Sequence, residues 1–248
     1  MDWVDTGIVL SARRHGETSA VVHVLTRSHG RCAGLVRGGA GRRAASVVQT
    51  GNEVQASWRA RLPQNLGTFT LELARPRAAR VLPDPLRLAA LTAAAEILDA
   101  TLPEREPHPG VFADLCEMLD AVEDDATDWM SRYARWELAL LSTLGFGLDL
   151  AALPGDGPWA VSERTGEIVA PEDDRNALPL PGILTGVATV GDHRPDSPAA
   201  SALVLVQALR VTGAFLRRAV ADPRNLRARI RLVERVTRQA AISGISGP

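Results

Sequence analysis

A change of hydrophobic period near residue 80 constrains the fold of this chain more than any other feature. Before it, apolar and polar residues alternate in short segments, a pattern typical of strands. From residue 84 onward apolar residues recur every three or four positions, a pattern typical of amphipathic helices. Three prolines within 76–85 mark the change. The sequence therefore predicts an α+β chain with a strand-rich domain at 1–80 and a helical domain at 81–248.

Five short segments in the first part carry strand signals. The clearest is Glu53 to Arg61, in which Val54, Ala56, Trp58 and Ala60 alternate with polar residues. Four other runs, bounded by turn residues, cover 4–12, 18–26, 32–36 and 68–73. A longer break with room for one helical turn, at 44–49, follows the third run. This order predicts a five-stranded β-barrel of the OB type, a fold that commonly binds single-stranded nucleic acid.

The stretch from Gly30 to Ser46 is rich in glycine and arginine. Its sequence, GRCAGLVRGGAGRRAAS, holds five glycines, four arginines and no acid. Glycine lets the backbone approach a ligand closely, and a guanidinium can contact a phosphate in bidentate fashion. A solvated surface loop is the commoner interpretation of such a stretch in isolation. The alternative is a loop that binds a polyanion.

The distribution of charge favours the polyanion. The formal net charge of −1 hides a segregation, because residues 1–80 carry 12 arginines and 5 acids. Residues 96–128 carry 11 acids and one arginine, and residues 210–238 carry nine arginines and two acids. A basic region at each end of an acidic middle indicates a polyanionic partner.

Helical patterns fill most of the second part. Asp84 is the expected N-cap of the first helix, with Pro85 at its first position. Further helices are predicted at 109–122, from 127 or 128 to 144, and at 197–221. We expect the acids of 96–128 to form solvated helix faces, since they lie along two predicted helices on the side opposite the apolar positions. The non-helical region at 147–181 contains a predicted hairpin of 159–162 with 167–170.

The last predicted helix is basic. Its arginines recur at spacings of three and four, which places them on one side, at Arg224, Arg227, Arg231, Arg235 and Arg238. Leu226, Ile230 and Val233 are expected on the opposite face. This row is either a second polyanion contact or a solvated face.

Motifs that carry catalysis are missing from the sequence. It has no phosphate-loop motif and no lysine to complete one, no G-x-S-x-G and no H-E-x-x-H. Cys32 and Cys116 stand far apart, without a C-x-x-C pair. We therefore expect a protein that is not an enzyme and has no cofactor. The acidic start, MDWVDTG, and the lack of a long apolar run predict a cytoplasmic protein with no membrane association.

Several blocks, taken in order, resemble the RecO family of bacterial recombination mediators. They are GIVLSARRHGETSAVVHVLTRSHGR, GLVRGGAGRRAAS, QTGNEVQASWRARLPQNLGTFTLE, RYARWELALLSTLGFGLDL, VSERTGEIV, LPLPGIL and ALRVTGAFLRR. Each block alone is weak, but the ordered series is specific and covers most of the chain. The fold of that family agrees with the barrel and helices predicted above.

The resemblance implies a nucleoid-associated, non-catalytic mediator of DNA repair and homologous recombination. Such a protein binds single- and double-stranded DNA and anneals complementary strands. With its partner RecR it promotes loading of the RecA recombinase onto DNA coated with single-strand-binding protein. DNA contacts of the family lie largely on the barrel, and the matching candidates here are Arg14, Arg31, Arg37, Arg42, Arg43, Arg59 and Arg61. The family's helical domain takes up the acidic tail of single-strand-binding protein, with Arg132 and Arg135 as the candidate contacts.

The sequence departs from the family at one site. Many relatives carry a zinc ion bound by cysteines just after the LGFGLDL block. Here the matching positions are Ala-Leu-Pro-Gly at 152–155 and Ala-Pro-Glu-Asp-Asp at 170–174. Without thiolate pairs the usual zinc site cannot form, so we expect apolar packing to hold the hairpin.

Two other functional classes remain open at this stage. One is a protein–protein adaptor in which the barrel is structural and the acidic helices bind partners. The other is an RNA-binding OB-fold protein.

Overall fold

Five strands close into a barrel at the N-terminal end of the chain. They are β1 (Asp2–His15), β2 (Ser19–Thr26), β3 (Gly30–Val36), β4 (Glu53–Arg59) and β5 (Gly67–Arg75), paired in the order β1-β2-β3-β5-β4 with β4 also paired to β1. All neighbours are antiparallel except β3 and β5. The short helix α1 (Arg42–Ala45) follows β3. The OB-type barrel predicted from the sequence is thus confirmed.

The computed structural model describes residues 1–62, 65–126, 128–148, 150, 153, 158–185 and 198–245. Contacts divide the chain into two units, Met1–Glu123 with Asn225–Arg229, and Asp124–Arg224 with Ile230–Pro248. The boundary expected after residue 80 marks the change from strands to helices. The first unit contains the barrel together with the three helices that follow it.

The barrel core follows the alternation of the strands. Val54, Ala56, Trp58 and Ala60 are all buried, as the pattern of β4 predicts. The indole Nε1–H of Trp58 donates a hydrogen bond of 3.0 Å to the carbonyl of Ala33, which satisfies its polar atom inside the core. A Cβ on Gly67 would lie 2.1 Å from the Trp58 ring. Glycine at position 67 therefore leaves the space that the indole fills.

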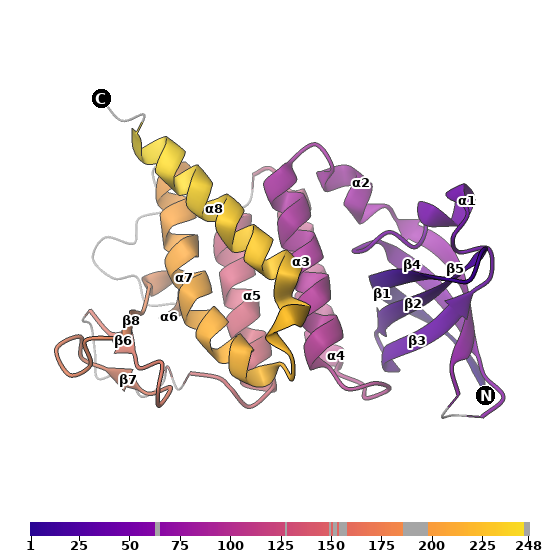
Figure 1. The fold of residues 1–248 in the computed structure, drawn as a ribbon, viewed down its shortest axis with the longest axis horizontal. Coiled ribbons are helices and arrows are strands. Elements are labelled where there is room, and N and C mark those ends of the chain that lie inside the picture. The colour runs from indigo at the N-terminus through magenta and orange to yellow at the C-terminus, as the bar shows by residue number, and fades with distance from the viewer. Residues whose placement is uncertain are drawn as a thin grey trace. The chain divides into compact units, whose positions relative to one another are not determined.

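Three helices complete the first unit, and Figure 1 shows them beside the barrel. They are α2 (Arg77–Val81), α3 (Pro85–Thr101) and α4 (Pro109–Glu123). The expected N-cap of α3 is confirmed, because Asp84 accepts hydrogen bonds from the amides of Leu86 and Arg87. Helix α3 packs along β1 and buries Leu91, among others, on its apolar side.

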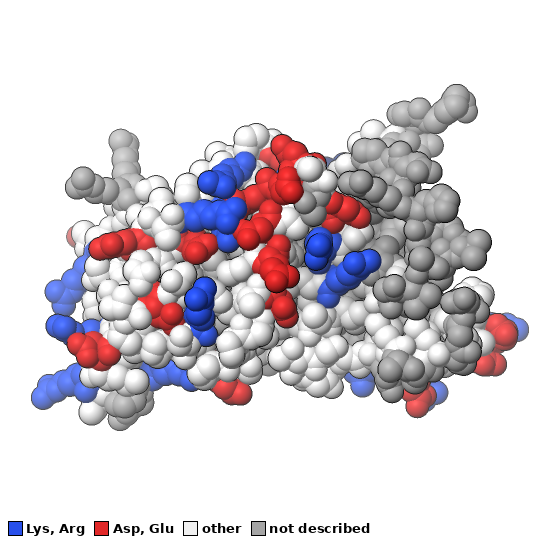
Figure 2. Space-filling view, turned by 180° about the vertical axis from the view of Figure 1, so that it is seen from behind, with Lys and Arg blue, Asp and Glu red and all other residues white. Residues whose placement is uncertain are grey.

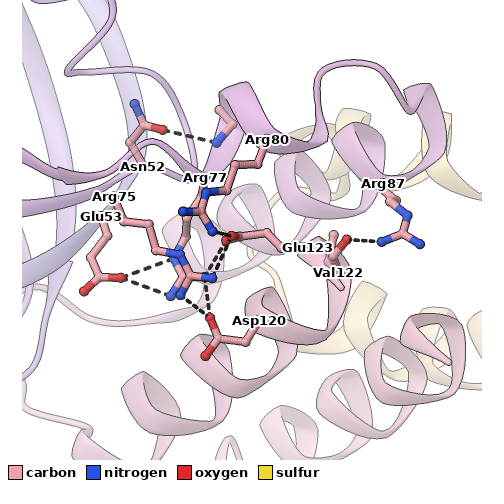
Figure 3. Close-up of polar contacts among 10 residues, drawn as sticks. Asn52, Glu53, Arg75, Arg77, Arg80, Arg87, Asp120, Val122 and Glu123 are labelled. Carbon is pink, nitrogen blue, oxygen red and sulfur yellow. Dashed lines mark hydrogen bonds and ion pairs between the residues drawn. The ribbon is translucent and has the colours of Figure 1, made fainter. Parts of the chain in front are cut away.

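The ends of β5 and α4 meet in an ion-pair cluster formed by Glu53, Arg75, Arg77, Arg80, Asp120 and Glu123 (Figure 3). We call this group the Arg77 cluster. The carboxylate of Glu123 is 5% exposed and accepts from all three arginines. The expectation that the acids of α4 form only a solvated face is therefore wrong at Glu123, because its partners come from a distant part of the chain.

Helices dominate the second unit. They are α5 (Trp129–Thr143), α6 (Gly182–Thr185), α7 (Pro198–Ala219) and most of α8 (Arg227–Ile245). The 3₁₀ turn η2 (Pro223–Leu226) precedes α8, and Asn225–Arg229 are grouped with the first unit. Asp128 caps α5, and Gly145 follows its end with a φ of 81°. The apolar side of α5 is buried as expected, at Trp129, Tyr133, Trp136 and Leu140.

A small three-stranded sheet lies in the second unit. The predicted hairpin is confirmed as β6 (Ala160–Val161) paired with β7 (Ile168–Val169). The sequence reading missed a third strand, β8 (Leu178–Pro179), which pairs with the other side of β6. A two-residue strand containing proline carries no alternation, so its pairing leaves no local signal.

The buried side of α8 differs from the predicted one. Leu232 and Val236 are fully buried, whereas Ile230, expected on the apolar face, is 51% exposed. Apolar residues occur on more than one side of this helix, and tertiary packing determines which side is buried. Among the residues described, no helix combines the length and apolar character needed to cross a bilayer.

Candidate nucleic-acid interface

An open groove of about 770 Å³ runs over the outside of the barrel between β1, β4 and β5. It contains two arginines, three hydroxyl side chains and two tryptophans, of which Trp3 is half-buried and Trp58 is buried. Its lining residues are Asp2, Trp3, Val4, Arg37, Ser57, Trp58, Arg59, Thr68 and Thr70. Guanidinium and hydroxyl groups are the donors that bind phosphate oxygens, so this groove has the composition of a phosphate-binding surface.

Strand register brings the two arginines to the same groove. Thr68 pairs with Arg59 on one side and with Leu35 on the other. Arg37 follows directly after β3, two residues beyond Leu35, and its side chain lines the same groove. Residues separated by 22 positions in the sequence therefore line one surface.

Arg59 is paired, but weakly. Its Nη2 lies 3.5 Å from Oδ2 of Asp2, and the two side chains are 81% and 70% exposed. Exposed ion pairs of this kind contribute little and are screened by salt. A phosphate entering the groove can therefore replace Asp2 as the partner of Arg59.

The loop that carries Arg37 is tied to the barrel. The amide of Gly39 donates to the carbonyl of Val36, and the amide of Ala40 donates to the carbonyl of Thr18. Gly38 has a φ of 71°, a conformation that favours glycine. The loop thus presents Arg37 from an anchored backbone, which lowers the entropy lost on binding.

Arg14 lies near this loop, on β1. Its partner in the register is Ala20, which in turn pairs with Val36 on β3. Two strand spacings separate Arg14 from Val36, which is about 10 Å, and the side chain of Arg14 is exposed. Arg42 and Arg43 begin α1, but their side chains lie outside the described part of the structure.

Arg31 differs from the other candidates because it is engaged inside the first unit. Its side chain is 15% exposed; Nε donates to the carbonyl of Leu102, and Nη1 lies 3.1 Å from Asp99. Asp99 also accepts from Ser11 and lies 2.5 Å from Nδ1 of His23. Arg31 does not line the groove, and its contacts hold α3 to the barrel.

The environment of Asp99 explains its ionisation. Burial by itself raises the pKa of Asp99, but the hydrogen bond and charge of His23, the Ser11 hydroxyl and Arg31 outweigh it. The pKa of Asp99 is therefore lower than its ordinary value of 3.8. This carboxylate stays charged and holds α3 to the outer face of β1, β2 and β3.

The remaining candidates are exposed. Arg61 follows β4, and Arg132 and Arg135 lie three residues apart on α5 in the second unit. Figure 2 shows basic side chains at the left edge, over the barrel, and acidic and basic side chains intermixed elsewhere on that face.

Of the residues that line the groove, only Arg37 and Arg59 were predicted as DNA contacts from the sequence. Thr68 and Thr70 alternate along β5, a pattern that would have placed both hydroxyls on one outer face. Trp3 also lines the groove. It stacks on His29, with ring centroids 4.2 Å apart, and this contact occupies one face of its indole.

Neither a cluster of metal ligands nor an ionised cysteine is present among the described residues. No three His, Cys, Asp or Glu side chains among them are close enough to hold a metal ion. Burial raises the pKa of Cys32 and of Cys116 to about 11, which keeps both thiols protonated at neutral pH. The arrangement can hold a polyanion through arginine and hydroxyl donors.

Known proteins match this chain along most of its length. The family described as Recombination protein O N terminal matches residues 1–77, and Recombination protein O C terminal matches residues 82–153. The chain is 44% identical to the DNA repair protein RecO of Rhodospirillum centenum, over 99% of both chains. It is 42% identical to a RecO of Cereibacter sphaeroides, over 96% of this chain and all of the relative. With the RecO of Rhodospirillum rubrum the identity is 39%, over 97% and 98% of the two chains.

Proposed function

This chain belongs to the RecO family, and we propose that it binds DNA through the barrel groove and acts there as a recombination mediator. Membership of the family supports a role in DNA repair and recombination. The observation that carries the more specific proposal is the convergence of Arg37 and Arg59 on one groove with the hydroxyls of Ser57, Thr68 and Thr70. The groove contains one carboxylate, Asp2, and it is exposed and weakly paired.

The proposed activity is non-catalytic. The protein binds single- and double-stranded DNA, brings complementary strands together and, with RecR, promotes loading of RecA onto DNA coated with single-strand-binding protein. A DNA-bound mediator of this kind is associated with the nucleoid. The strand-binding step rests on the arginine and hydroxyl lining of the groove, which offers donors to phosphate oxygens. The steps with RecR and RecA rest on membership of the family.

A second contact is proposed on α5. Arg132 and Arg135 are exposed and three residues apart, which places both on one side of the helix. We assign them to the acidic C-terminal tail of single-strand-binding protein, because guanidinium groups pair with carboxylates in bidentate fashion. Replacing both by alanine is expected to weaken binding of a peptide with that tail sequence and to leave binding of a bare oligonucleotide unchanged.

The DNA contact is tested by equilibrium binding to a single-stranded oligonucleotide across a salt series. The variant Arg37→Ala with Arg59→Ala removes both groove cations. Each lost phosphate contact is expected to weaken binding and to make the log–log salt slope shallower by about 0.7. The matched control is Arg164→Ala with Arg175→Ala, two exposed arginines of the second unit. It removes the same charge and is expected to change the slope little.

The same assay separates the alternatives. If the groove variant keeps the affinity and salt slope of the wild type, the groove is not the DNA contact. If neither variant nor wild type binds DNA, the adaptor interpretation is favoured. Competition between DNA and RNA strands of the same sequence then tests the RNA-binding alternative. An annealing assay with complementary oligonucleotides measures the mediator activity itself.

A further inference from the structure

A second hollow adjoins the groove on the other side of Arg37. It has a volume of about 450 Å³ and lies between α1 and β5. Its walls are largely aliphatic or aromatic, and its lining residues are Val36, Arg37, Gly38, Ala44, Val47, Val48, Thr68, Phe69, Thr70 and Leu71. This volume falls in the range of small-molecule sites, which is about 300–1,000 Å³. We call it the α1 hollow.

Arg37, Thr68 and Thr70 line both the groove and the α1 hollow. A group held by Arg37 therefore has an arginine- and hydroxyl-lined surface on one side and an apolar recess on the other. The wall formed by α1 is fixed by hydrogen bonds, since the amides of Val47 and Val48 both donate to the carbonyl of Ala44. A nucleotide has the matching chemistry, with a charged phosphate next to a flat base of low polarity on its faces.

We propose that the α1 hollow receives an unpaired nucleobase of a single strand while Arg37 holds a neighbouring phosphate. This inference rests on the proposed function, because it assigns the substrate class of the same surface. In a duplex the bases are stacked and paired, so none reaches a recess in the protein without the cost of unstacking. An unpaired base is free to enter. The hollow thus favours single strands over duplexes.

The contacts in the hollow are mainly aliphatic. Phe69 is 2% exposed and belongs to the barrel core, so its ring does not present a free stacking face. Val47 and Leu71 are partly buried and supply apolar surface in its place. Dispersion and apolar burial do not distinguish one base from another. Binding is therefore expected to prefer unpaired bases without a strong preference for sequence.

The test fills the hollow and compares three ligands. Ala44→Leu places a larger side chain at a lining position, and Ala45→Leu makes the same change at the next residue, which is exposed and does not line the hollow. The probes are an oligothymidylate, an abasic strand of equal length and a duplex of equal length. The abasic strand retains the phosphates and lacks the bases.

Wild type is expected to bind the abasic strand about tenfold more weakly than the oligothymidylate, the scale of burying one apolar group of side-chain size. Ala44→Leu is expected to bind the oligothymidylate more weakly and the abasic strand as wild type does, so the difference between the two ligands disappears. Ala45→Leu is expected to behave as wild type. Leu71→Phe fills the hollow from β5, at a position that does not line the groove, and serves as a second variant if Ala44→Leu does not fold, as judged by circular dichroism.

Two results would overturn the inference. One is an unchanged preference for the oligothymidylate over the abasic strand in a folded filling variant. The other is an equal loss of affinity for all three ligands. Failure of the proposed function gives a different result. In that case the double variant Arg37→Ala with Arg59→Ala binds DNA with the same affinity and the same salt slope as the wild type.

Discussion

The guanidinium of Arg77 lies 2.6 Å from Oε1 of Glu123, and the two side chains are 2% and 5% exposed. Arg77 begins α2 and Glu123 ends α4, so the pair joins two helices of the first unit. Glu53 from β4 also contacts Arg77, which extends the connection to the barrel. A buried pair of this kind can be neutral overall when compared with apolar side chains, but removal of one partner leaves an uncompensated charge.

Replacing Arg77 by alanine is therefore expected to lower the free energy of unfolding by about 3–5 kcal/mol. The measurement is urea denaturation followed by circular dichroism. The control is Arg80→Ala, which also removes a partner of Glu123 but at a side chain that is 55% exposed. Its cost is expected to stay below about 1 kcal/mol. Equal costs for the two variants would show that burial of Arg77 does not determine its contribution.

Stability is expected to fall in acid partly through Asp99. The pKa of Asp99 is lower in the folded protein than its ordinary value of 3.8, so its contribution is complete above the unfolded pKa. That contribution is lost as the pH falls through the folded pKa. Asp99→Asn is expected to destabilise the protein at neutral pH and to differ less from wild type at about pH 3.

The midpoint of urea unfolding at the two pH values measures this effect of Asp99. Asp114→Asn on the exposed side of α4 is the control, and its difference from wild type is expected to be small at both values. A gap between Asp99→Asn and wild type that stays constant with pH would contradict the assignment.

Gly30 is expected to be intolerant of alanine. Its φ is 68°, and a Cβ would lie 2.1 Å from the backbone oxygen of Glu106. Left-handed backbone costs about 1–2 kcal/mol for other residues, and forced repacking adds about 1–3 kcal/mol. Gly16 has a φ of 64° with nothing within 4 Å of the same position. Gly16→Ala therefore isolates the backbone cost, and thermal melting of the two variants should show a clearly larger loss for Gly30→Ala.

Purified protein is expected to contain no stoichiometric zinc. The region 147–181 contains no cysteine, and thiolates are the ligands of the site found in many relatives. Elemental analysis after dialysis against a chelator measures the metal directly. One zinc per chain, retained through that treatment, would show that a different ligand set has replaced the cysteines. The positions 152, 154 and 155 lie outside the described residues.

Local chemistry was sufficient to predict much of this protein. The alternation in Glu53 to Arg59 determined which side of β4 is buried, because successive strand residues point to opposite faces. Asp84 was recognisable as the cap of α3, since a carboxylate before a helix accepts from its first free amides. The order of five strands with a break after the third was enough to predict the OB-type barrel.

The tertiary structure alone decided which charged residues face inward. Arg31 and Asp99 are 68 positions apart, and Arg77 and Glu123 are 46 apart, so no local pattern reveals their pairing. Likewise, the register of β3, β4 and β5 brought Arg37 and Arg59 to one groove. Periodicity reports the face of a residue on its own element. Packing between distant segments determines which element covers that face. For this reason only the tertiary structure distinguishes the arginines of the groove from the arginines that hold the fold together.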